Sequence, residues 1–257
     1  MSSETPPNAW TERADRTSYG AQEGWVRRAL LVTLFAVAFG YVESAVVVYL
    51  RVIYDPVRAS LYPQKPPESL LPLMTVEQLR AVDPLHVRRL VIEVGRELAT
   101  MVLLATVACL AARRRGEFLA IFMIAFGVWD ATYYVGLKAL IDFPISLTTW
   151  DILFLIPVPW LGPVLAPLIV SLSMIIAWLV ILTETGRGRA FRPAWFHWAG
   201  VVLGGLIIIA SFCKDYVRTT SGELPEPFDW FIFATGEAVG LLAFGHALVR
   251  GRRSVSA

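Results

Sequence analysis

The chain has 257 residues, of which 56% are hydrophobic and 17% are charged, and its formal net charge is +2. This charged fraction is below the roughly 25% that is usual in soluble domains, and the mean hydropathy is +0.58. Several apolar runs reach about 20 residues, the length that crosses a bilayer as a helix. The composition therefore excludes an ordinary soluble domain, argues against a nucleic-acid partner, and predicts an all-α, multi-pass membrane protein.

The first residues, 1–24, are polar and rich in Ser, Thr, Pro and charge, and they predict a disordered cytoplasmic tail. The first apolar run is too long for a cleavable signal peptide, so it is expected to remain as a span. Residues 25–250 form the predicted transmembrane domain, and residues 251–257 a short basic cytoplasmic tail. The six predicted spans lie at about residues 29–50, 86–112, 118–140, 162–182, 195–213 and 229–249.

Basic residues mark one side of this arrangement. Because Lys and Arg are enriched in cytoplasmic loops, clusters that share one side of a six-span chain define the inner face. Both termini are therefore predicted to be cytoplasmic, in a protein of the cell (inner) membrane. Cys109 and Cys213 then lie near opposite faces and are not expected to form a disulfide. The clusters that define the inner face are residues 27–28, 113–115, 187–192 and 250–253.

The connection between the third and fourth spans, residues 141–160, is unusual. Its apolar part is too short to cross a membrane, and its prolines prevent a regular helix. It is expected to be a Pro-rich re-entrant segment or an interfacial lid over the outer mouth of the bundle. An ordinary loop with Trp anchors at the headgroups is the alternative. The expected lid residues are Trp150, Asp151, Pro157, Pro159 and Trp160.

Five acids lie inside the predicted spans: Glu43, Glu93, Glu97, Asp130 and Glu237. A charge near the bilayer centre costs about 2.5 kcal/mol or more, so such residues normally face a bundle interior or a cavity. All but Glu93 are eight residues from a charged residue expected at the outer interface, which is about 12 Å along a helix. The sequence thus predicts one acidic pocket in the outer leaflet, built from the first, second, third and sixth spans.

Helical spacing adds neighbours to these acids. Glu93 and Glu97 share one stripe with Thr100, and Arg96 can pair with Glu93. Asp130, Tyr134 and Lys138 are aligned at a spacing of four. The complete set of residues expected to bind a ligand or protons is Glu43, Glu93, Arg96, Glu97, Asp130, Tyr134, Lys138 and Glu237.

The acids outnumber the cations at this level, so the excess must be protonated, bound to metal, or matched by a cationic ligand. The favoured hypothesis is proton-coupled transport or binding of a cation or protonatable small solute, with the bilayer as partner and a homo-oligomer supplying symmetry. The first alternative is a metal-dependent enzyme acting on a lipid-like substrate, with Glu43, Glu97 and Asp130 as ligands of a divalent metal. A haem held by His197 and His246 is the second. A purely structural role, with Arg96 and Lys138 neutralising the acids, is the third.

Overall fold

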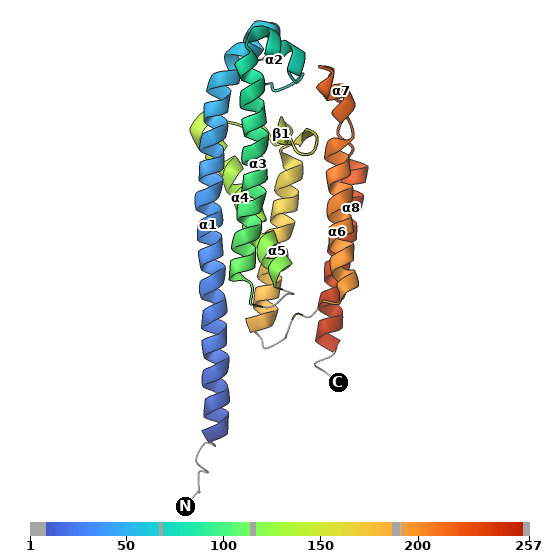
Figure 1. Cartoon of the computed structure of the whole chain (residues 1–257). Coiled ribbons are helices and arrows are strands. Elements are labelled where there is room, and N and C mark those ends of the chain that lie inside the picture. Colours follow the sequence, from blue (N-terminus) through green and yellow to red (C-terminus); the bar gives the residue numbers. More distant parts are fainter. Residues whose placement is uncertain (1–8, 67–68, 114–116, 187–190, 192, 254–257) are drawn as a thin grey trace, which may run out of the picture.

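The computed structural model describes residues 9–66, 69–113, 117–186, 191 and 193–253. Six of its helices are long and apolar enough to cross a membrane, which confirms the predicted all-α class and the number of spans. The first of them begins, and the last ends, at the same end of the bundle (Figure 1), called here the terminal end. The six helices are α1 (Ala9–Leu61), α3 (Pro84–Ala111), α4 (Phe118–Ile141), α5 (Leu165–Gly186), α6 (Trp195–Cys213) and α8 (Trp230–Arg253).

Helix α1 is longer than the sequence indicated. It begins at Ala9, within the segment expected to be a disordered tail, and it continues without interruption to Leu61. Pro56 lies inside the helix, where it removes a single backbone donor one turn before the end. The expected tail residues 1–8 lie outside the described part of the chain.

Two short helices lie at the opposite end, called here the capped end (Figure 1). They are α2 (Val76–Val82) and α7 (Tyr216–Thr220). A capping box starts α2, because the Thr75 hydroxyl and the Gln78 side chain each accept the other's backbone N–H. Asp83 caps α3, whose first residue is Pro84, a position where the missing donor is not needed. These local signals fix the turn that separates α1 from α3.

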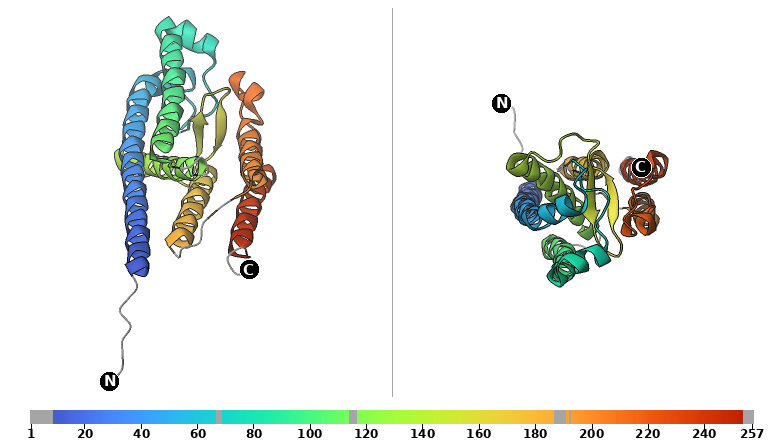
Figure 2. Two further views of the ribbon diagram at one scale, coloured as in Figure 1. Left: turned by 60° about the horizontal axis from the view of Figure 1, so that its bottom comes forward. Right: turned by 90° about the horizontal axis from the view of Figure 1, so that it is seen from above.

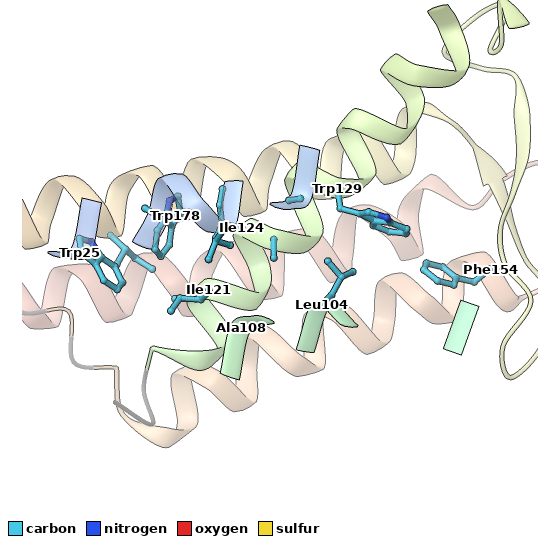
Figure 3. Close-up of a cluster of buried hydrophobic side chains, with 14 residues drawn as sticks. Trp25, Leu104, Ala108, Ile121, Ile124, Trp129, Phe154 and Trp178 are labelled. Atoms are coloured by element: carbon cyan, nitrogen blue, oxygen red, sulfur yellow. The ribbon is translucent and has the colours of Figure 1, made fainter. Parts of the chain in front are cut away.

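Helix α4 is the centre of a four-helix group, because it packs against α1, α3 and α5. The approach to α1 is close at Gly40, where an added Cβ would lie 2.6 Å from the Trp129 carbonyl oxygen. The buried core of this group is shown in Figure 3, where Leu104 of α3 and Ile124 of α4 lie between aromatic rings. Trp25 and Trp178 form one end of this core, with ring centroids 5.1 Å apart.

Helices α6 and α8 form a separate pair. An added Cβ on Gly204 would lie 2.6 Å from the Gly236 carbonyl oxygen, so the two backbones are in direct contact. The pair packs against the rest of the chain mainly through α5 and the strand β2 (Trp160–Pro163). The molecule therefore consists of four packed helices beside a tightly joined pair (Figure 2).

A β-hairpin lies between these two parts (Figure 2). Strand β1 (Trp150–Phe154) pairs with β2 in antiparallel fashion, with Asp151 opposite Gly162. The proline-rich connection thus contains a hairpin whose backbone groups pair between two strands. Trp160 stacks on Phe212 of α6, with a centroid distance of 6.4 Å and an interplanar angle of 12°. The hairpin therefore bridges the two groups of helices.

Candidate functional site

One cavity of about 690 Å³ lies between the four-helix group and the α6–α8 pair. Its wall includes residues from all six long helices, from the hairpin and from the segment around α2. All five acids that the sequence placed within spans border it. Seven acids and three arginines line it in total: Glu43, Asp55, Glu93, Glu97, Asp130, Asp151 and Glu237, with Arg51, Arg58 and Arg96.

Arg96 accounts for two of these acids. Its guanidinium donates to Glu93 Oε1 from Nε at 2.9 Å, and its Nη1 forms an ion pair with Glu43 Oε1. Thr100 is the second group beside Glu43, and its hydroxyl donates to Oε2 at 3.4 Å. One guanidinium therefore bridges Glu43 and Glu93, and this part of the site joins α1 to α3 in the manner of a structural ion network.

Glu97 lies beside this network but has a different partner. Its Oε2 accepts a hydrogen bond of 2.7 Å from the backbone N–H of Leu155, at the end of strand β1. The side chain is only 7% exposed, and it makes no ion pair among the residues that the structure describes. Glu97 thus fixes the hairpin against α3 while keeping a carboxyl group without a cationic partner.

Asp130 and Glu237 approach helix α5 from α4 and α8. Asp130 Oδ2 accepts a hydrogen bond of 2.7 Å from the Ser171 hydroxyl. Glu237 interacts with Ser173, while its buried Oε1 has no hydrogen-bond partner in the described part of the chain. Since Ser171 and Ser173 are two residues apart on one helix, these acids lie at nearly the same height along α5.

Asp151 joins the site from the hairpin. Its Oδ2 accepts a hydrogen bond of 3.1 Å from the Tyr134 hydroxyl, and the residue is only 3% exposed. Burial raises the pKa of the Asp151 carboxyl to about 6, although Arg51 and the Ile152 N–H act in the opposite direction. Asp151 therefore titrates closer to neutrality than an exposed aspartate does.

Other expected site residues lie elsewhere. Lys138 does not line the cavity; it is exposed and forms an ion pair of 2.6 Å with Asp142 just after α4 ends. Its long side chain follows the helix end outward rather than inward. Of the expected lid residues, Asp151, Pro159 and Trp160 border the cavity, whereas Trp150 contacts Phe228 and Pro157 is exposed.

The two cofactor hypotheses do not fit the geometry. No group of three His, Cys, Asp or Glu side chains converges to hold a metal ion within the described ranges, and the expected ligand Glu43 is paired with Arg96 instead. His197 Nε2 and His246 Nδ1 are 2.9 Å apart and hydrogen-bonded to each other. Axial ligands bind opposite faces of a haem, and this distance leaves no room for iron between the nitrogens.

The sequence did not reveal Ser173 and Arg51 as residues of the cavity wall, or Ser171 as the partner of Asp130. Ser171 and Ser173 are single hydroxyls within a strongly apolar span, a signal that the chain contains but that does not reveal a partner. Arg51 was expected only as an interface marker, yet it lines the cavity, and its guanidinium lies 4.1 Å from the Phe143 ring centroid. Comparisons with protein-family models, with curated proteins and with solved structures found no match to this chain.

Proposed function

We propose that the chain binds a small cationic or protonatable solute in this cavity and exchanges it for protons across the cell membrane. The observation that carries the proposal is the set of three carboxyl groups of Glu97, Asp130 and Glu237. They come from three helices, border one cavity, and make no ion pair among the described residues. A carboxyl group in such surroundings is stable when it is protonated or when a cation faces it, so the two occupants replace each other.

The aromatic wall supports a cationic occupant. Trp129 and Tyr133 border the cavity next to Asp130, and aromatic rings attract ammonium groups through their electron-rich faces. The hairpin supports a gated site, because it connects the two groups of helices through Glu97 on one side and Phe212 on the other. Movement of the α6–α8 pair relative to the rest would change access to Glu97 and Asp130, which belong to the four-helix group, and would carry Glu237 of α8 with it.

Binding is tested by calorimetry on the full chain in nanodiscs, with butylamine and tetramethylammonium as probes. Glu97→Gln, Asp130→Asn and Glu237→Gln keep the side-chain shapes but remove the charge. Each is expected to weaken butylamine binding about tenfold or more, since a hydrogen bond to a charged group contributes about 1.5–3 kcal/mol. Tetramethylammonium has no N–H donor, and its binding should weaken through the loss of charge attraction alone. Glu77→Gln is the matched control, because Glu77 is exposed on α2 and does not border the cavity. Unchanged affinity in all three cavity variants would refute the proposal.

Exchange is tested in proteoliposomes that contain tetramethylammonium and a pH-sensitive dye. Efflux of the cation should acidify the lumen with wild-type protein and with Glu77→Gln, but only weakly with Glu97→Gln. Tetramethylammonium is suited to this assay because it has no neutral form that could cross the lipid and carry protons. Binding without a change in luminal pH would contradict the exchange and leave a binding protein.

A further inference from the structure

The cavity extends beyond the carboxyl groups into a space lined only by apolar side chains, called here the apolar chamber. Its residues come from four different helices of the bundle, and all of them border the same cavity as the acids. They are Met101 of α3, Phe122 and Phe126 of α4, Met174 of α5, and Leu241 and Phe244 of α8.

Helix direction places this chamber on the terminal side of the carboxyl groups. On α4, which starts at the terminal end, Phe122 and Phe126 come eight and four residues before Asp130. On α8, which ends there, Leu241 and Phe244 come four and seven residues after Glu237. At about 1.5 Å per residue, these side chains are about 6–12 Å from the acids along their own helices.

Glycines on α6 and α8 show that the chamber wall is open. An added Cβ on Gly205 or on Gly240 would meet no atom within 4 Å, and both residues border the cavity. Their neighbours Gly204 and Gly236 differ, because an added Cβ there would clash with the partner helix. One face of the α6–α8 pair is therefore packed, and the other faces open space.

We infer that the solute is an amphipathic amine, whose ammonium binds at the carboxyl-lined part of the cavity, bordered by Glu97, Asp130 and Glu237, and whose hydrocarbon part fills the apolar chamber. This inference rests on the proposed function and adds the substrate class. A hydrated inorganic cation would satisfy the acids and gain nothing from the chamber, whereas an alkyl chain gains from each methylene that it buries. The positions of the acids and of the apolar chamber set the orientation of the bound amine, with its alkyl chain toward the terminal end and its ammonium toward the hairpin.

The test is calorimetry on the full chain in nanodiscs with ethylamine, butylamine, hexylamine and octylamine, after subtraction of heats from empty nanodiscs. Full burial of the chain predicts an affinity gain of about fourfold for each added methylene. Octan-1-ol carries the same chain without the charge and is expected to bind at least tenfold more weakly than octylamine.

Two variants separate the chamber from the surrounding lipid. Gly205→Phe places a ring in the open space of the chamber wall and should reduce octylamine affinity at least tenfold while leaving ethylamine affinity unchanged. Gly240→Phe makes the same test from α8 if Gly205→Phe does not fold. The matched control is Gly95→Phe, because Gly95 also has open space around it but is exposed and lies outside the cavity. It should bind the whole series as the wild type does.

Three outcomes would decide against parts of the account. If affinity does not depend on chain length, the substrate class is wrong and the proposed function still stands. If Gly205→Phe and Gly95→Phe both retain the wild-type dependence of affinity on alkyl-chain length, the alkyl chain lies in lipid and the apolar chamber is not its binding site. If octanol binds as tightly as octylamine, the chamber binds hydrocarbon but the acids do not select a cation, and the proposed function fails.

Discussion

Replacing Asp151 with asparagine should stabilise the protein at neutral pH. The buried carboxyl has a pKa raised from 3.8 to about 6, so the folded state favours its protonated form more than the unfolded chain does. The resulting stability is fully present below about pH 4 and is lost as the pH rises through about 6. A difference of about two pKa units corresponds to about 3 kcal/mol. The asparagine side chain would imitate the protonated form and still accept the hydrogen bond from Tyr134.

The assay is thermal unfolding in detergent between pH 4 and pH 8. Asp151→Asn should match the wild type near pH 4 and exceed it increasingly up to pH 7, where a gain of up to about 3 kcal/mol corresponds to roughly 6–12 °C in Tm. Asp142→Asn changes a side chain that is 85% exposed and should alter stability by no more than about 0.5 kcal/mol. A lower Tm for Asp151→Asn at pH 7, or a difference that does not vary with pH, would refute the reasoning.

Three further variants test separate parts of the structure. Arg96→Gln removes the cation between two mostly buried acids, so unfolding in denaturant should show that the free energy of unfolding falls by about 3 kcal/mol. Adding Glu43→Gln should recover part of this loss. A loss below about 1 kcal/mol for Arg96→Gln alone would contradict the ion network. Gly204→Leu should disrupt the α6–α8 contact and lower Tm, whereas Gly205→Leu, with open space at the Cβ, should fold normally. An equal change of Tm in the two variants would contradict the described packing of α6 against α8. Lys138→Gln should leave butylamine affinity unchanged, because the ion pair of Lys138 lies outside the cavity. A tenfold loss of butylamine affinity would show that Lys138 contributes to binding.

Hydropathy was sufficient to predict the six helical spans, because each span is long and nearly continuous and the bilayer permits little other than helices. The spacing of Glu43, Glu97, Asp130 and Glu237 also carried information about the site, since a buried acid is costly unless it faces other polar groups. All four border one cavity. Helical periodicity likewise anticipated the pairing of Arg96 with Glu93, which are one turn apart.

Other features depend on contacts that a single sequence does not specify. The hairpin could not be derived, because a short apolar run broken by prolines suits a loop as well as a strand. The sequence could not identify Ser171 as a partner of Asp130, because the hydrogen bond between them depends on the rotation of α5 relative to α4. Lys138 was misplaced because its spacing from Asp130 fixes the side of the helix but not the direction in which a long side chain extends.

Carbodiimide labelling tests the central claim most directly, because dicyclohexylcarbodiimide is apolar and attaches to protonated carboxyl groups. The account predicts that peptide mass spectrometry of the membrane-embedded protein finds the label on Glu97, Asp130 and Glu237 and not on the exposed Glu77. Saturating tetramethylammonium, which does not react with the reagent, should protect the three cavity acids. If tetramethylammonium does not reduce the labelling, or if these acids are not labelled at all, the result would contradict a shared site in which protons and a cation replace each other.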